Sequence, residues 1–154
     1  FDSNELDSVF VGLSSVDPEH VGKGVIQKVY GRCQQDIIDW EKREGTRLLL
    51  WATTFNRATY INATRLFPEL EPDEHKDYTE YPRLALEIAK AIRHLHYPRC
   101  ESLSDNPFVL KGVAKGVSPE HAAKFNLFKK LDVNPEKGDR VLMILQRPQH
   151  LKTG

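Results

Sequence analysis

The chain alternates between short apolar runs and amphipathic stretches, which is the pattern of a domain built from strands and helices. The apolar run Val9-Phe10-Val11 comes before a break at Asp17-Pro18. From Val25 to Arg43 the apolar residues recur every three or four positions, which predicts a helix that ends at Gly45. An unbroken apolar centre within residues 47–54 predicts a strand covered on both faces. This order predicts two parallel strands joined by a right-handed crossover.

The apolar stripe of this first helix should face the core. It consists of Ile26, Val29 or Tyr30, Cys33, Ile37 and Trp40.

A second helix is predicted from about Asn56 to Leu66, with Thr53 or Thr54 as its cap. Residues 68–77 are rich in acidic residues and interrupted by prolines, so they are expected to form a loop outside the core. Pro82 suits the first turn of a third helix. The buried stripe of that helix is predicted to be Leu84, Ile88, Ile92 and Leu95.

The last third of the chain predicts two more strands and a helix. Residues 106–113 are expected to form a strand, and Ser118-Pro119-Glu120 to open a helix that contains Phe125, Phe128 and Leu131. Residues 140–146 predict a final buried strand, and the tail from Pro148 is expected to fray. With 154 residues, the whole predicts one α/β domain, in which helices cover both faces of a mixed, mostly buried sheet.

Charge and cysteine content narrow the classes of partner. Lysine and arginine number 22, as do aspartate and glutamate, so there is no basic excess of the kind that nucleic acids or anionic membranes attract. No apolar run approaches the roughly 20 residues of a membrane-spanning helix. Two cysteines, one of them on the predicted core face of a helix, argue against a disulfide framework and favour the cytoplasm.

Two glycines just before the first helix are the strongest candidate for chemistry. Without side chains, Gly22 and Gly24 allow the main chain to approach an anion closely. The N–H groups at the start of the following helix point at the same place, with the positive end of the helix dipole. An apolar strand, a glycine turn and an amphipathic helix are the context that a diphosphate site requires. The alternative is a glycine pair that merely makes a tight turn.

Residues 9–67 resemble the core of the GNAT superfamily, the N-acyltransferases that use acetyl-coenzyme A. The family pattern is Arg or Gln, two residues, Gly, one residue, then Gly or Ala, and it is only partly met. Val21 stands at the Arg/Gln place, Gly24 at the conserved glycine place and Ile26 at the closing place. The resemblance therefore implies weaker coenzyme A contacts from side chains and unchanged contacts from backbone amides.

The resemblance also assigns site residues. It implies that Leu13, Ser14, Ser15 and Val16 meet the pantetheine arm of acetyl-coenzyme A. It implies that Val21, Gly22, Lys23, Gly24, Val25 and Ile26 hold the phosphates. Asn56 matches the asparagine that follows the family's next strand, and Tyr60 is the substitute for the tyrosine that protonates the departing thiolate, one turn early.

What the resemblance implies overall is direct transfer of an acetyl or related acyl group from coenzyme A to an amine, either a small molecule or a peptide. Only eight residues precede Val9, whereas the family has a front half of strands and helices there. Either the chain is the end of a longer protein, or residues 97–147 supply the absent or rearranged elements. The oligomeric state, a homodimer included, stays open.

Two other function classes stay open: a degenerate GNAT-like domain that acts by partner recognition, and an unrelated phosphate-binding α/β enzyme. Among other residues, Tyr78, Glu80, Tyr81 and the acidic run 69–77 are secondary candidates for contact with a cationic amine. The cluster His94, His96 and Cys100 matches no common zinc spacing, so no metal site is expected.

Overall fold

A computed structural model describes residues 7–12, 17–118 and 125–145, apart from the side chain of Tyr78. The chain divides into two compact units, unit 1 (residues 1–50) and unit 2 (residues 51–154), and the boundary lies inside a strand. In chain order the elements are β1 (Ser8–Phe10), η1 (Pro18–His20), α1 (Val25–Glu44), β2 (Leu49–Thr54), α2 (Arg57–Leu66), η2 (Tyr78–Glu80), α3 (Arg83–His96), η3 (Pro98–Cys100), β3 (Val109–Leu110), α4 (Asn126–Lys130), η4 (Pro135–Lys137) and β4 (Arg140–Leu145), where η denotes a 3-10 helix.

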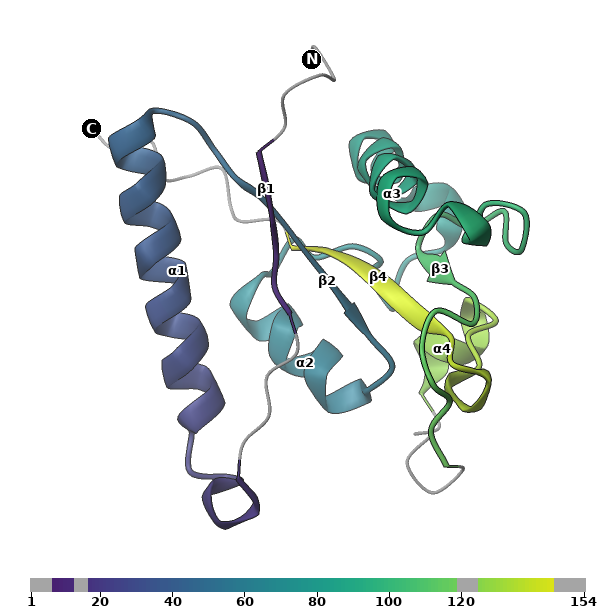
Figure 1. Ribbon diagram of the computed structural model, residues 1–154, viewed down its shortest axis with the longest axis horizontal. Helices are drawn as coiled ribbons and strands as arrows, with labels where there is room; N and C mark the ends of the chain where they lie inside the picture. The colour runs from purple at the N-terminus through teal and green to yellow at the C-terminus, as the bar shows by residue number, and fades with distance from the viewer. Residues whose placement is uncertain (1–6, 13–16, 119–124, 146–154) are drawn as a thin grey trace. The chain divides into compact units, whose positions relative to one another are not determined.

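The strands form one mixed sheet, hydrogen-bonded in the order β1-β2-β4-β3. β3 and β4 are antiparallel, with Val109 opposite Val141 and Leu110 opposite Arg140. In unit 1 the Leu49 N–H donates to the Asp7 carbonyl (3.0 Å), and β1 runs in the same direction as the start of β2 (Figure 1). The α/β class and the mixed sheet predicted from the sequence are thus confirmed.

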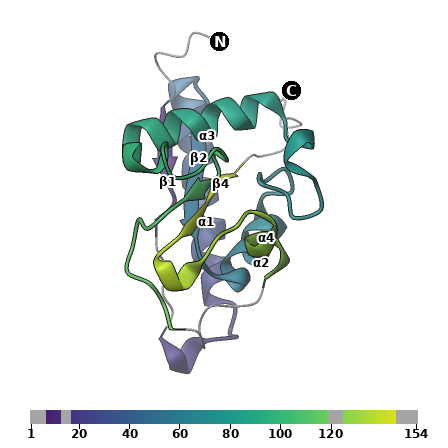
Figure 2. The same ribbon diagram turned by 90° about the vertical axis from the view of Figure 1, so that its right-hand side faces the viewer.

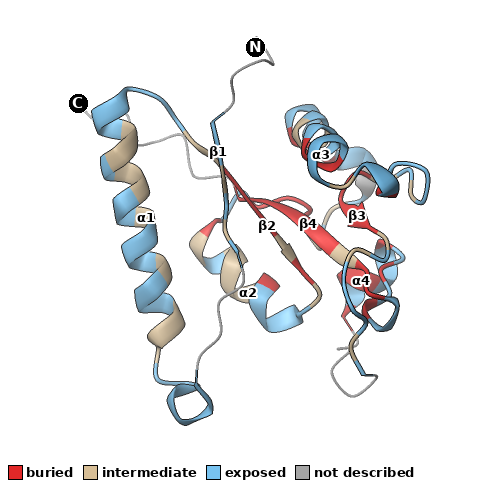
Figure 3. Ribbon diagram, viewed as in Figure 1, coloured by how far each residue is buried: buried red, intermediate tan, exposed pale blue. Residues whose placement is uncertain are grey.

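Unit 1 consists of β1, η1, α1 and the start of β2. Helix α1 covers the predicted span, and Gly45 ends it in the left-handed conformation (φ 69°), donating its N–H to the Glu41 carbonyl at 2.9 Å. None of the 20 residues of α1 is buried (Figure 3). The prediction that Cys33 faces the core is therefore wrong, because its side chain is exposed.

Unit 2 holds the core of the molecule. Five of the six residues of β4 are buried, as expected for the final strand. In the part of β2 that belongs to unit 2, the consecutive residues Trp51 and Ala52 are buried, which requires cover on both faces. β4 lies between α3 and α4 in both views (Figures 1 and 2). β3 is shorter than the predicted strand. α4 runs only from Asn126 to Lys130 because Phe125, its N-cap, has an extended backbone, so the prediction that Phe125 and Leu131 lie within the helix is wrong. The predicted opening of that helix at residues 119–120 lies outside the described residues.

The buried face of α3 differs from the predicted stripe. Ala85, Ala89 and Ile92 are buried, whereas Leu84 and Leu95 are 49% and 73% exposed. The alanines lie four residues apart on one side of the helix, and their small side chains let the α3 backbone approach β4. Large apolar side chains dominate a hydrophobic pattern, so the sequence predicted the neighbouring stripe of leucines and isoleucines to be the buried one.

The acidic segment at 68–77 is not simply a surface loop, which corrects the expectation. Leu70, Glu71 and Pro72 are buried, and Glu71 extends the sheet by exchanging backbone hydrogen bonds with Ile144 (3.1 and 2.8 Å). The Glu71 carboxylate accepts from Lys76 Nζ at 2.6 Å. Its burial is tolerated because both the backbone and the charge are paired.

Two further backbone segments meet closely in unit 2. Ala114 N–H donates to the Gly138 carbonyl (3.2 Å), and a Cβ on Gly138 would lie 1.9 Å from the Ala114 oxygen. The buried carboxylate of Asp139 accepts from the N–H groups of Gly112 and Asn134, each at 2.9 Å. Lys111 Nζ lies 3.2 Å from the same carboxylate, which neutralises the buried charge.

Candidate functional site

The glycine turn precedes α1 in unit 1. Asp17 accepts the Glu19 N–H (2.9 Å) and so fixes η1, after which the chain turns through residues 21–24. Gly22 and Gly24 have φ values of 79° and 72°, in the left-handed region that favours glycine. Among described residues other than each glycine and its chain neighbours, no atom lies within 4 Å of a Cβ built on Gly22, and only Gln27 Oε1, at 3.9 Å, is that close to one on Gly24. The described residues therefore leave space beside the two glycines, while the N–H groups of Val21 and Lys23 donate to the carbonyls of Pro18 (3.4 Å) and His20 (3.2 Å).

The start of α1 is left without a side-chain cap. Gly24 occupies the N-cap position, and no acidic residue lies in the first turn. The first bond of the helical ladder runs from Lys28 N–H to the Gly24 carbonyl (3.2 Å), so the N–H groups of Val25, Ile26 and Gln27 precede the ladder. No acidic residue within the first turn therefore offsets the positive end of the helix dipole, an arrangement that suits an anion.

The remaining predicted cofactor residues fall elsewhere. Leu13, Ser14, Ser15 and Val16 lie outside the described residues. Asn56 is in unit 2, where its side-chain oxygen accepts the Ala58 N–H (2.8 Å) and caps α2. The predicted caps were Thr53 or Thr54. The Thr54 hydroxyl instead bonds Asn56 itself, donating to the carbonyl (3.2 Å) and accepting from the N–H (3.0 Å).

Tyr60 lies one turn beyond Asn56 on α2, and its side chain is almost fully buried, with 1% exposed. Its hydroxyl donates to the Pro72 carbonyl (2.8 Å) and accepts from the Glu74 N–H (3.0 Å). Burial is the main reason that the pKa of this hydroxyl is raised above the ordinary tyrosine value. Tyr60 thus keeps its proton at neutral pH and ties the acidic segment to α2.

Among the predicted site residues, Val21 to Ile26 come together in the turn of unit 1, and Asn56 and Tyr60 come together on α2 of unit 2. The partners of the Tyr60 hydroxyl were missed in the sequence, because a main-chain carbonyl and N–H carry no sequence signal. Of the secondary candidates, Glu80 accepts the Asp77 N–H (2.6 Å), and Tyr81 is buried.

The side chains of the cluster His94, His96 and Cys100 each contact other residues of unit 2. His94 Nδ1 lies 2.8 Å from Glu101, and the His96 ring lies 5.0 Å from the ring of Trp51, centroid to centroid. The Cys100 thiol is buried and contacts the Lys111 carbonyl, and its burial raises its pKa. Within the described part of the chain, no group of three or more histidine, cysteine or acidic side chains is arranged to hold a metal ion.

Comparison with known proteins gives no family: no family model, no curated protein and no solved structure matches the chain. Over residues 7–12, 17–118 and 125–145, the structure has no helix that is both long enough and apolar enough to cross a membrane.

Proposed function

We propose that the chain binds an acyl-coenzyme A at the glycine turn and transfers the acyl group to an amine, as a divergent relative of the GNAT acyltransferases. One observation carries the proposal. In unit 1 a strand leads through two left-handed glycines to a helix start that has neither a side-chain cap nor an acidic residue in its first turn. Backbone N–H groups there are free to bind a pyrophosphate, which is the chemistry that this arrangement supports best.

The side chains near the turn define how strong this binding should be. Lys23 lies between the two glycines and is exposed, so its ammonium group can reach a phosphate as a point charge. Val21 is 67% exposed and offers no hydrogen bond, unlike the Arg or Gln of the family pattern. We therefore expect affinity to come mainly from main-chain amides and one cation, and to fall with rising salt.

In the proposed reaction an unprotonated amine attacks the thioester carbonyl, the new C–N bond forms, and the C–S bond breaks. The amine loses a proton and the departing thiolate gains one. Tyr60 is the proposed donor to the thiolate. To act, its hydroxyl would have to leave the Pro72 carbonyl to which it now donates.

That bond also favours a second candidate function, a domain that binds coenzyme A without transferring an acyl group. The Tyr60 hydroxyl has both a donor and an acceptor partner within the fold, so its position is accounted for by structure alone. One assay separates transfer from binding alone. The chain is incubated with acetyl-coenzyme A and a panel of amines, and the release of free coenzyme A is measured by chromatography. Release above the uncatalysed rate supports transfer, and binding without release supports the second candidate.

The first experiment is a calorimetric titration of the full chain with acetyl-coenzyme A, coenzyme A, ATP and NAD. Selective binding of the two coenzyme A forms supports the proposal. Preference for ATP or NAD would instead support an unrelated phosphate-binding α/β enzyme. Absence of binding to all four ligands would refute both.

A matched pair of variants places the ligand. Gly24→Ala and Gly45→Ala each put a Cβ on a left-handed glycine at an end of α1, with φ values of 72° and 69°. The backbone strain is therefore similar, about 1–2 kcal/mol for each. We expect Gly24→Ala to weaken coenzyme A binding and Gly45→Ala to leave it unchanged. Equal losses would show that the effect comes from stability and not from the turn.

A further inference from the structure

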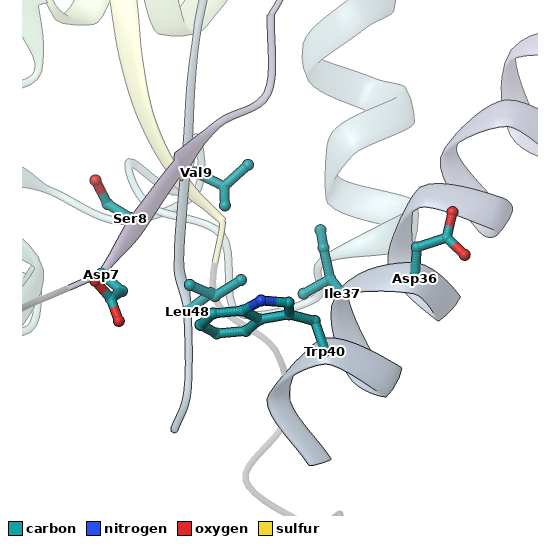
Figure 4. Close-up of a pocket in the computed structure, with 7 residues that line it drawn as sticks. All are labelled: Asp7, Ser8, Val9, Asp36, Ile37, Trp40 and Leu48. Carbon is teal, nitrogen blue, oxygen red and sulfur yellow. The ribbon is translucent and has the colours of Figure 1, made fainter. Parts of the chain in front are cut away.

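Unit 1 contains a second concave feature, a hollow of about 430 Å³ between the second half of α1, β1 and the residues just before β2. Its lining consists of Asp7, Ser8, Val9, Asp36, Ile37, Trp40 and Leu48. Figure 4 shows Val9, Ile37 and Leu48 gathered around the Trp40 ring. All four of these apolar side chains are only partly buried, so the hollow has an apolar wall that the described residues leave accessible.

The hollow is separate from the glycine turn. Val25, at the start of α1, and Ile37, in the hollow, are twelve residues apart on one straight helix, which corresponds to about 18 Å. A group bound here does not compete for the backbone N–H groups that the phosphates would use. Its volume falls within the range of sites that take small ligands, roughly 300–1,000 Å³.

The polar part of the lining carries negative charge. Asp36 is already paired, because Arg32 Nη2 lies 2.9 Å from its carboxylate, and Figure 4 shows that carboxylate pointing away from the indole. Asp7 differs: its backbone carbonyl is fixed by the Leu49 N–H, while no ion pair joins its carboxylate to another described residue. The hollow therefore combines an apolar wall, an indole face and one uncompensated carboxylate.

We propose that this hollow binds a small hydrophobic primary amine in its ammonium form. The apolar body packs against Ile37, Leu48 and the Trp40 ring, and the ammonium group pairs with Asp7. An anion would be repelled by the carboxylates, and a neutral apolar molecule would leave Asp7 unpaired. Indole faces and carboxylates both attract organic cations, and their combination selects for a cation with an apolar body.

The inference deepens the proposed function, on which it rests in one respect: it names hydrophobic primary amines as the acceptor class. For transfer, the bound ammonium ion first releases one proton to solvent, and the free amine then attacks the thioester. Binding of the amine itself needs no coenzyme A. A failure of the amine site and a failure of the coenzyme A site are therefore seen in separate titrations.

The two tryptophans of the chain provide the readout. Trp40 lines the hollow, whereas Trp51 is in unit 2 and only 5% exposed. In the Trp51→Phe variant, Trp40 is the sole indole, and its fluorescence is followed during titration with phenethylammonium chloride. The matched neutral probe is 2-phenylethanol, which has the same ring and chain length. We expect a saturable change with the amine and an affinity for the alcohol weaker by about tenfold.

The charge variants make the test specific. Asp7→Asn should lower the affinity for the amine by about three- to tenfold and leave that for the alcohol unchanged. Asp39→Asn is the matched control, since Asp39 lies on α1, accepts from Gln35 Nε2 (2.8 Å) and does not line the hollow. Equal affinities for the two probes, an equal effect of Asp39→Asn, or no saturable change at Trp40 would each overturn the proposal.

If Trp51→Phe does not fold, the same titration is followed in the unmodified chain through the indole N–H resonances. Trp40→Phe identifies the Trp40 signal by removing it. The expected result is a shift of that signal on addition of the amine with the Trp51 signal unmoved, and the opposite pattern overturns the proposal.

Discussion

The two units of this chain bury their side chains very differently. In unit 2, β4 has five buried residues out of six and aromatic rings pack on one another, as in the pair Phe125 and Phe128 with centroids 5.0 Å apart. In the described part of unit 1, Leu50 is the sole buried residue, although α1 carries Ile37, Ile38 and Trp40. Unit 2 thus has a packed core, whereas the described side chains of unit 1, apart from Leu50, are at most partly buried.

This difference has a functional meaning. Both features proposed to bind ligands, the glycine turn and the hollow beside Trp40, lie in unit 1. Binding segments tend to come from the less stable parts of proteins, because a ligand must reach backbone groups that a dense core would cover. Tyr60, in contrast, belongs to the packed unit and is engaged there.

The largest effect is expected where packing in unit 2 is broken at Gly138. A Cβ there would lie 1.9 Å from the Ala114 carbonyl oxygen, on a backbone with φ 84°. Gly138→Ala should therefore lower the free energy of unfolding by about 3–5 kcal/mol, measured by urea denaturation.

Two controls separate the clash from the backbone strain. Gly112 in unit 2 (φ 59°) and Gly45 in unit 1 (φ 69°) are also left-handed, but no atom of the described residues beyond the chain neighbours lies within 4 Å of a Cβ built on either. Gly112→Ala and Gly45→Ala should each cost only about 1–2 kcal/mol. A loss at Gly112 as large as at Gly138 would mean that packing is not what distinguishes the position.

Hydrogen exchange measures the difference between the units directly. The amides of β4 should exchange only through global unfolding, since the strand is buried and paired on both sides. The amides of α1 should exchange through local opening, at a free energy lower by about 3 kcal/mol, because no residue of the helix is buried. Equal protection of α1 and β4 would break the comparison.

Tyr60→Phe tests how tightly the acidic segment is tied to the core of unit 2. Loss of the hydroxyl leaves the Pro72 carbonyl and the Glu74 N–H without this partner, so stability should fall by about 1–3 kcal/mol in urea unfolding. If Tyr60 also donates the proton in transfer, kcat should fall while the affinity for coenzyme A is retained. A full loss of stability with unchanged kcat would leave Tyr60 a structural residue.

The same variant has a predictable dependence on pH. Burial raises the pKa of Tyr60 in the folded chain, while the unfolded chain has the ordinary value of about 10. A raised folded pKa contributes stability that is complete below the unfolded pKa and is lost as the pH rises above it. Above about pH 10 the unmodified chain should therefore lose stability more steeply than Tyr60→Phe, by at most about 1.4 kcal/mol per pH unit. Parallel curves would show that the hydroxyl ionises as easily in the fold as in the unfolded chain.

Strongly periodic segments were predictable from the sequence. The spans of α1, β2 and β4 follow from apolar spacing and from Gly45, and the glycine turn follows from its composition. These features depend on local steric preferences, which a short window of sequence contains.

Features that depend on distant partners were not predictable. From the sequence, Glu71 was expected to be an exposed acidic residue. In the structure it is buried, because Ile144 pairs with its backbone and Lys76 with its carboxylate. In α3 the choice between a leucine stripe and an alanine stripe depends on how closely β4 approaches, which no local pattern encodes. At the candidate site, Tyr60 was proposed from the family resemblance, and its hydrogen-bond partners were not predictable because they come from a segment that folds back on it.

The smallest effect is expected at Asn56, and it sharpens the contrast between the two helix starts, since α2 is capped and α1 is not. Asn56→Ala removes the acceptor for the Ala58 N–H and should cost about 1 kcal/mol in urea unfolding, whereas Asn56→Asp keeps an acceptor and should be nearly neutral.

The pair of Asn56 variants also separates capping from the cofactor contact that the family resemblance implies. If Asn56 contacts coenzyme A, Asn56→Asp weakens its binding through the added negative charge while stability is unchanged; if Asn56 only caps α2, coenzyme A binds to Asn56→Asp as it does to the unmodified chain.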